Sequence, residues 1–132
     1  RLGIETKLSR FGVPPDRPMI AITNYERLER FDPADYAGII LDESSILKSF
    51  QGKTSRALIA AFSQTPYRLA GSATPAPNDY MEIGQHTAFL GVMTGSEMLS
   101  RFFIADQEQA GKYRLKKPAI APFWDWVASW AR

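Results

Sequence analysis

Gly38-Ile39-Ile40-Leu41-Asp42-Glu43 is the stretch that decides the fold, because an apolar run ends there abruptly in two adjacent acids. A short apolar run bounded in this way is typical of a buried strand. Ligands of parallel sheets bind outside the carboxyl ends of the strands. We therefore expect this strand to deliver two carboxylates to a ligand-binding edge. A strand end followed by a helix cap is the alternative interpretation of the two acids alone.

Apolar runs and helical patterns alternate on both sides of this stretch, and such alternation indicates βαβ units with a parallel sheet. The run at 19–23 has the composition of a buried strand, and from Gly95 onward the pattern becomes mainly helical. The expected elements are strands at 4–10, 19–23, 38–41 and 67–70 and helices at 25–31, 54–63 and 79–90, the first of them capped by Asn24. The sequence therefore predicts an α/β fold.

The composition is that of a globular protein, with 132 residues of which 45% are hydrophobic and 23% charged. The absence of cysteine excludes disulfides, thiolate zinc sites and cysteine nucleophiles, and a single histidine, His86, excludes multi-histidine metal sites. A net charge of +2 permits nucleic acid as a partner without requiring it. No apolar run approaches the roughly 18 residues of a membrane span, so we expect a cytoplasmic protein without a membrane partner.

A second chemical signal, Gly71-Ser72-Ala73-Thr74-Pro75, also follows an expected strand. Small hydroxyl side chains at a strand end can hydrogen-bond a phosphate and respond to its loss. The same composition is common in turns, so this stretch has little meaning alone. Its occurrence together with the acids is what favours a nucleotide site.

Three motifs follow one another in the order 22–26 (ITNYE), 41–45 (LDESS, with Lys48 after it) and 72–78 (SATPAPN). In this order and at these separations they resemble motifs Ib, II and III of the Swi/Snf-type branch of the superfamily-two helicases. The segments 113–116 and 123–130 further resemble helicase-like proteins of phages and prophages, which implies a bacterial or phage-infected cell.

The resemblance implies a partial RecA-like (P-loop NTPase) parallel sheet with flanking helices. Residues 1–92 would be the carboxyl-side part of the first RecA-like domain, and residues 93–132 the start of a mainly helical segment. Because the chain begins at Arg1 rather than Met and stops at Arg132 within a helical pattern, we expect a fragment. The upstream phosphate-binding loop and a second RecA-like domain would be its partners within the same longer chain.

The resemblance also implies a role for each matching residue, with ATP and Mg²⁺ as cofactors. Asp42 would hold Mg²⁺ through water, and Glu43 would activate the hydrolytic water. Ser72 and Thr74 would contact the nucleotide and couple its state to movement along duplex DNA. The protein would bind this DNA without sequence specificity. The residues expected at DNA are Thr23, Asn24 and Tyr25, Lys48 after motif II, and Lys112 and Arg114 of the basic stretch 112–117.

Ser44-Ser45 departs from the family pattern, because motif II usually reads Asp-Glu-Ala-His and its histidine helps motif II contact motif III. His86 itself is interpreted as a packing or surface residue, and the three tryptophans as packing residues rather than base-stacking ones. Without a phosphate-binding loop, these residues would not hydrolyse ATP alone. Two alternatives to the translocase remain, a noncatalytic DNA- or protein-binding remnant of such an ATPase and the motor subunit of a restriction-modification system.

Overall fold

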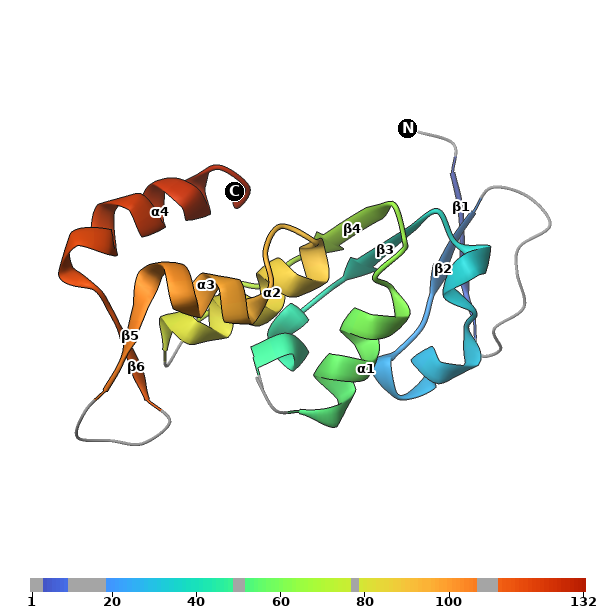
Figure 1. The fold of residues 1–132 in the computed structure, drawn as a ribbon. Helices are drawn as coiled ribbons and strands as arrows, with labels where there is room; N and C mark the ends of the chain where they lie inside the picture. Colours follow the sequence, from blue (N-terminus) through green and yellow to red (C-terminus); the bar gives the residue numbers. More distant parts are fainter. Residues whose placement is uncertain (1–3, 10–18, 49–51, 77–78, 107–111) are drawn as a thin grey trace. The chain divides into compact units, whose positions relative to one another are not determined.

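The computed structural model describes residues 4–9, 19–48, 52–76, 79–106 and 112–132 of a mixed α/β protein. Within this described part of the chain the strands form three separate two-stranded sheets (Figure 1). The chain divides into two compact units: unit 1 comprises residues 1–39 and 65–67, and unit 2 comprises residues 40–64 and 68–132. The α/β class is therefore confirmed, whereas the RecA-like topology and the division at residue 92 stay predictions.

Unit 1 is built on two parallel strands, β1 (Glu5–Leu8) and β2 (Met19–Ile22), with Glu5 opposite Met19 and Leu8 opposite Ile22. Two 3-10 helices follow, η1 (Tyr25–Arg30) and η2 (Pro33–Asp35). The expected strands are thus present. The prediction that the second is buried is wrong, because Ile20 and Ile22 are 43% and 50% exposed. Alternate side chains of β2 are exposed, and all four residues of β1 are exposed.

The cap predicted for the helix after β2 is also wrong. Asn24 precedes η1 in an extended conformation, but its side chain makes no capping hydrogen bond. The reason lies in the tighter 3-10 geometry, in which a residue donates to the carbonyl three positions back. The Arg27 N–H, the group that an Asn24 side chain would cap, instead donates to the Asn24 carbonyl oxygen at 3.2 Å.

Unit 2 holds most of the helices and the ends of the second strand pair, β3 (Gly38–Leu41) with β4 (Tyr67–Ala70), whose bounds agree with the predicted ones. The helix expected at 54–63 is α1 (Lys53–Ala61), and that expected at 79–90 begins as a 3-10 turn. The remaining elements are η3 (Ser44–Lys48), η4 (Tyr80–Glu82), α2 (Ile83–Leu90), α3 (Gly95–Phe102), β5 (Phe103–Ala105), β6 (Tyr113–Leu115), η5 (Lys117–Ala119) and α4 (Ile120–Ala128).

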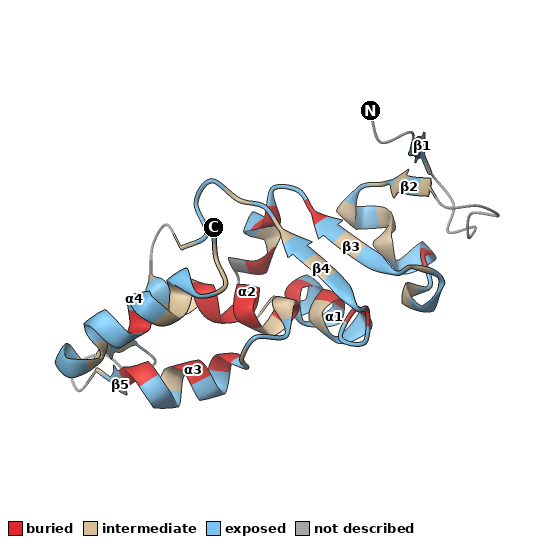
Figure 2. Ribbon diagram, turned by 90° about the horizontal axis from the view of Figure 1, so that it is seen from above, coloured by how far each residue is buried: buried red, intermediate tan, exposed pale blue. Residues whose placement is uncertain are grey.

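The helix α2 is the most buried element of unit 2, and six of its eight residues are buried (Figure 2). Gly84 permits the close approach of α3, since a Cβ atom there would lie 3.0 Å from Met98 Cε and 3.3 Å from Gly95 Cα. Gly91 ends α2 with φ 72°, a left-handed conformation that glycine adopts without steric cost. The position of α2 therefore depends on two glycines.

An aromatic and aliphatic core joins α2, α3, β5 and α4. Its buried members are Ile83, Met98, Phe102, Phe103 and Phe123. Phe123 is fully buried, with its ring 5.4 Å from that of Phe102 and 5.7 Å from that of Phe103. Aromatic pairs at these separations add to the free energy gained by burial alone. The core thus fixes α4 to the rest of unit 2.

The tryptophans of α4 and of the turn after it differ in environment. Trp126 stacks on Phe102 at 5.2 Å and Trp130 lies edge-on to Trp126 at 5.5 Å, so the packing interpretation is confirmed for these two. Trp124 is 42% exposed. Its ring therefore presents much of its surface to solvent.

The expectation of a mainly helical segment after residue 93 is incomplete, because β5 and β6 pair antiparallel within it. Phe103 lies opposite Leu115, and both pack into the aromatic core. Strands of three residues are too short to display a period of two in the sequence. No helix of the described residues combines the length and the apolar character that a membrane crossing requires.

Replacing Phe123 by alanine should lower the free energy of unfolding by about 3–5 kcal/mol, because a buried ring is lost and a cavity remains. Ile120→Ala, on the same helix but at a site 47% exposed, is the matched control and should cost much less. Urea unfolding followed by circular dichroism measures both values. Equal losses for the two variants would contradict the assignment of Phe123 to the core.

Candidate active site

The ends of β3 and β4 are tied together by one residue. The Gly71 N–H donates to the Leu41 carbonyl oxygen at 2.8 Å, and the Gly71 carbonyl oxygen accepts from the Ser44 N–H at 2.8 Å. Leu41 and Ser44 flank Asp42 and Glu43, which together are called the acidic turn. Gly71, the residue that follows β4, therefore holds the acidic turn on both sides. The acids and the hydroxyl segment that begins at Ser72 therefore lie at one end of this strand pair.

The acidic turn has an unusual backbone conformation. Glu43 has φ 50°, the single positive φ of a non-glycine residue in the described part of the chain. The Glu43 N–H donates to Asp42 Oδ1 at 3.1 Å, and both side chains are exposed. Left-handed conformations cost non-glycine residues free energy and cluster at functional sites. The strain at Glu43 is therefore a structural reason to consider this turn as a site.

The chemistry of this turn suits a hard cation that is shared with a phosphate. Carboxylate oxygens are ligands that Mg²⁺ prefers, and it usually binds through one or two carboxylates, several waters and substrate phosphates. Among the described residues no group of three or more His, Cys, Asp or Glu side chains could form a metal cage. Within the described part of the chain, Asp42 and Glu43 could thus hold Mg²⁺ together with water and a phosphate ligand.

The hydroxyl segment beside the acids has a local turn of its own. Ser72 Oγ accepts from the Thr74 N–H at 3.2 Å, Ser72 is half-buried and Thr74 is exposed. Hydroxyls often hydrogen-bond the backbone two residues on, which fixes the turn. Ser72 and Thr74 therefore sit on an ordered segment next to the acidic turn, and the role in ATP binding stays a prediction.

His86 is the residue of this region whose contact the sequence interpretation missed. Its Nε2 lies 3.2 Å from Ser44 Oγ in a buried contact, and its Nδ1 lies 3.4 Å from the Glu82 carbonyl oxygen. A carbonyl oxygen can only accept, so in the neutral ring Nδ1 carries the proton and the Ser44 hydroxyl donates to Nε2. The lone histidine of the chain thus contacts Ser44, the residue that follows the two acids.

A signal for this contact was present in the sequence. The segment 41–45, which is predicted to be motif II, has no histidine, and the single histidine of the chain lies between two polar residues on the helix expected at 79–90. The first of these, Gln85, accepts from Ser55 Oγ at 3.4 Å in a second buried polar contact, with α1. Polar side chains of α2 therefore contact both η3, at Ser44, and α1, at Ser55.

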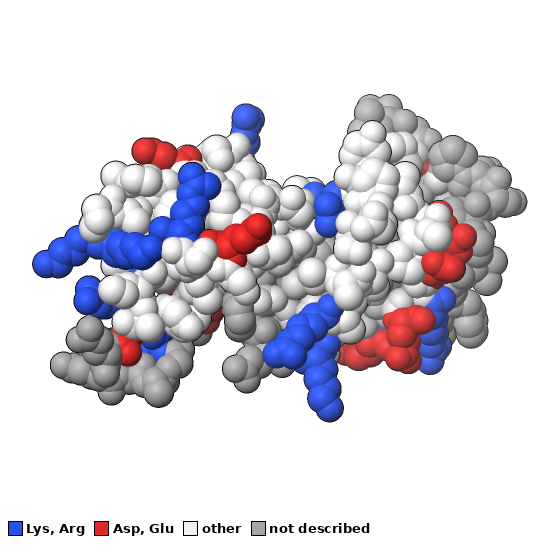
Figure 3. All heavy atoms as spheres, in the orientation of Figure 1, with Lys and Arg blue, Asp and Glu red and all other residues white. Residues whose placement is uncertain are grey.

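The residues predicted to contact DNA belong to both units. In unit 1, Thr23 and Tyr25 are half-buried, Asn24 is exposed, and Thr23 Oγ1 is buried without a hydrogen-bond partner among the described residues. In unit 2, Lys48 ends η3, and Lys112 and Arg114 are exposed. Figure 3 displays several Lys and Arg side chains near the end of unit 2 that carries β5, β6 and α4. The DNA role of all six residues stays a prediction.

Comparison of the chain with models of protein families, with curated proteins and with solved structures found no match. The motif resemblance therefore stays a prediction, and the function has to be argued from the residues and their contacts.

Ser44→Ala should lower the free energy of unfolding by about 1–3 kcal/mol, because it leaves the buried Nε2 of His86 without its donor. Ser45→Ala is the matched control, since its hydroxyl is exposed, and it should change stability by less than about 0.5 kcal/mol. Urea unfolding of both variants measures the difference. An equal effect of the two substitutions would count against the buried contact.

The neutral His86 ring should carry its proton on Nδ1. Because the chain has one histidine, nitrogen-15 NMR needs no residue assignment, and the couplings of each ring nitrogen to the two carbon-bound ring protons distinguish Nδ1 from Nε2. We expect the protonated-nitrogen signal from Nδ1 and the unprotonated one from Nε2. The opposite tautomer would contradict the hydrogen bonds to Glu82 and Ser44.

Proposed function

We propose that the chain is part of the first ATP-hydrolysing domain of a DNA-dependent ATPase of the superfamily-two helicase type. Such a protein would use ATP and Mg²⁺ to move on duplex DNA or to remodel it. The observation that carries the proposal is the acidic turn, in which a strained Glu43 follows Asp42 and Gly71 holds both flanks. The ordered motifs of the sequence support the same function.

Two adjacent carboxylates suit two separate tasks in ATP hydrolysis. Asp42 would hold Mg²⁺, through water, so that the ion neutralises charge on the phosphates. Glu43 would orient and deprotonate the water that attacks the γ-phosphate in line with the leaving oxygen. Both side chains are exposed, so a nucleotide delivered by the rest of the protein can reach them.

Loss of the γ-phosphate has to be transmitted to the DNA-binding parts. Ser72 and Thr74 would detect it, because their segment follows the residue that holds the acidic turn. The buried Ser44–His86 contact offers a second route, from the turn into α2. In this proposal His86 replaces, from a different element, the histidine that motif II lacks.

Contact with DNA would be sequence-independent and made largely to phosphates. Neutralisation of phosphates by Lys and Arg supplies most nonspecific affinity. Lys48, Lys112 and Arg114 would provide this charge, while Thr23, Asn24 and Tyr25 would lie along the backbone. The phosphate-binding loop and the second RecA-like domain would come from other parts of the same protein.

Glu43→Gln in the longer protein should abolish ATP turnover and leave ATP binding intact, because the amide cannot take a proton from water but keeps the size of the side chain. Steady-state ATPase assays with DNA and equilibrium binding of ATP measure the two properties. Glu29→Gln, an exposed position in η1, is the control and should retain turnover.

Retained turnover in Glu43→Gln would refute the assignment of the acids. If the unaltered longer protein binds DNA but neither binds nor hydrolyses ATP, the noncatalytic remnant replaces the proposal. The observation that favours this second candidate is Ser44-Ser45 in motif II.

A further inference from the structure

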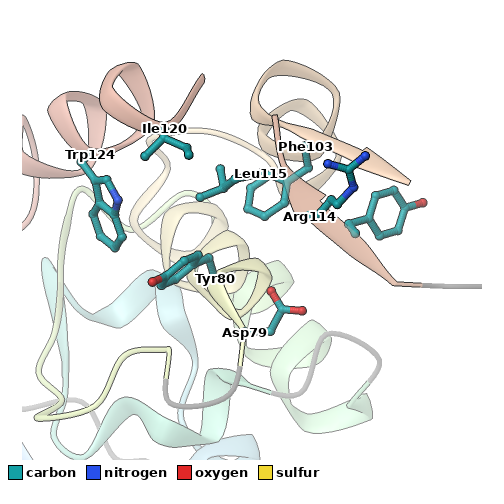
Figure 4. Close-up of a pocket in the computed structure, with 8 residues that line it drawn as sticks. Asp79, Tyr80, Phe103, Arg114, Leu115, Ile120 and Trp124 are labelled. Carbon is teal, nitrogen blue, oxygen red and sulfur yellow. The ribbon is translucent and has the colours of Figure 1, made fainter. Parts of the chain in front are cut away.

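A pocket of about 390 Å³ lies within unit 2 (Figure 4), and neither Asp42 nor Glu43 is among the described residues that line it. Its size falls in the range of roughly 300–1,000 Å³ that is usual for small-molecule sites. Eight residues from η4, β5, β6 and α4 and their connections line it: Asp79, Tyr80, Phe103, Tyr113, Arg114, Leu115, Ile120 and Trp124. The lining is mostly aromatic and aliphatic, with one acid and one cation.

The aromatic residues of this pocket offer open ring surface. Tyr80 and Trp124 are 45% and 42% exposed, and their rings lie edge-on to each other at 5.1 Å. The ring of Phe123, fully buried behind them, packs 5.2 Å from Trp124 and 6.2 Å from Tyr80. Phe123 therefore holds the two exposed rings in place, at nearly a right angle to each other, so that a planar ligand can stack on one ring and meet the other with its edge.

The two charged residues make the pocket selective for a ligand with polar edges. Asp79 accepts from the Met81 N–H at 2.9 Å, which fixes its carboxylate at the start of η4. A carboxylate has acceptor sites for more than one bond, so it can also accept N–H groups of a ligand. Arg114 is exposed on β6 and lies across the pocket from Trp124 (Figure 4).

The surroundings of Arg114 favour an anionic polymer. Lys112 and Lys117 are exposed, whereas Lys116 donates to the carbonyl oxygens of Ser100 and Arg101 at 2.8 and 3.2 Å. Lys116 therefore stabilises the fold. The side chains that face solvent at the pocket rim or beside it are those of Arg114, Lys112 and Lys117. A ligand with one planar, apolar ring and a phosphate next to it matches this arrangement.

We propose that this pocket binds one unpaired nucleobase of single-stranded DNA. The base would stack on the ring of Trp124 and meet the nearly perpendicular ring of Tyr80 with its edge. Its N–H groups would reach Asp79, and the adjacent phosphate would contact Arg114. Stacking on aromatic side chains tolerates every base, because every base has a π-face. This site goes beyond the proposed ATPase, for which duplex DNA is the track, and it requires neither ATP nor the acidic turn.

The test compares two oligonucleotides of equal length and charge, an oligothymidylate and an oligomer of abasic residues. Fluorescence anisotropy at one fixed salt concentration gives the dissociation constant of each with the 132-residue chain. The unaltered chain should bind the abasic oligomer about 5- to 100-fold more weakly, because base stacking is lost. Equal affinities for the two oligomers would overturn the proposal.

Variants then locate the base. Trp124→Leu, and separately Tyr80→Leu, should reduce the difference between the two oligomers and leave affinity for a hairpin duplex unchanged. Tyr67→Leu is the matched control, because Tyr67 lies in β4 outside the pocket and is 73% exposed. A difference that persists in both pocket variants would place the bases elsewhere and overturn the proposal.

Arg114→Gln separates the phosphate contact from the base contact. It should weaken both oligomers by a similar factor and preserve their ratio, since both carry the same phosphates. Unchanged affinity in this variant would contradict the role of Arg114. None of these results bears on the ATPase assay of Glu43→Gln.

Discussion

The burial of α2 is the constraint on which the rest of unit 2 depends. A helix of eight residues is too short to be stable in water alone, so its stability has to come from packing. Gly84 admits α3 at close range on one face, while Gln85 and His86 reach α1 and η3. Because buried polar groups are costly when unpaired, these contacts fix how the surrounding elements meet α2.

The acidic turn is held by two kinds of interaction. Backbone hydrogen bonds to Gly71 tie it to the end of β4, and the Ser44–His86 contact ties its first following residue to α2. Backbone strain persists in a protein only where the surroundings over-determine it. The left-handed Glu43 is such a case, since the residues on either side of the acids are both anchored.

The two proposed sites of unit 2 share one segment of chain. Asp79 and Tyr80 line the aromatic pocket, and η4, which begins at Tyr80, continues directly into α2. Further along α2, His86 contacts Ser44, the residue that follows the acidic turn. If both proposals hold, ATP hydrolysis at the acids and the binding of a base in the pocket both act on the segment formed by η4 and α2. This segment would then couple the two ligands.

The sequence by itself determined the strands at 38–41 and 67–70, the helix near 54–63 and the acidic motif, because each is encoded by a local run bounded by turn residues. The tertiary structure decided what depends on residues far apart in the chain: that Ser44 meets His86, that β5 pairs with β6, that β2 stays half-exposed, and that Trp124 faces a pocket while Trp126 is packed. A local sequence pattern shows whether a segment has the hydrophobic period of a helix or a strand, and which functional groups the segment contains. They cannot specify which distant side chain satisfies a buried hydroxyl or covers an aromatic ring, since that is settled only when the elements pack together.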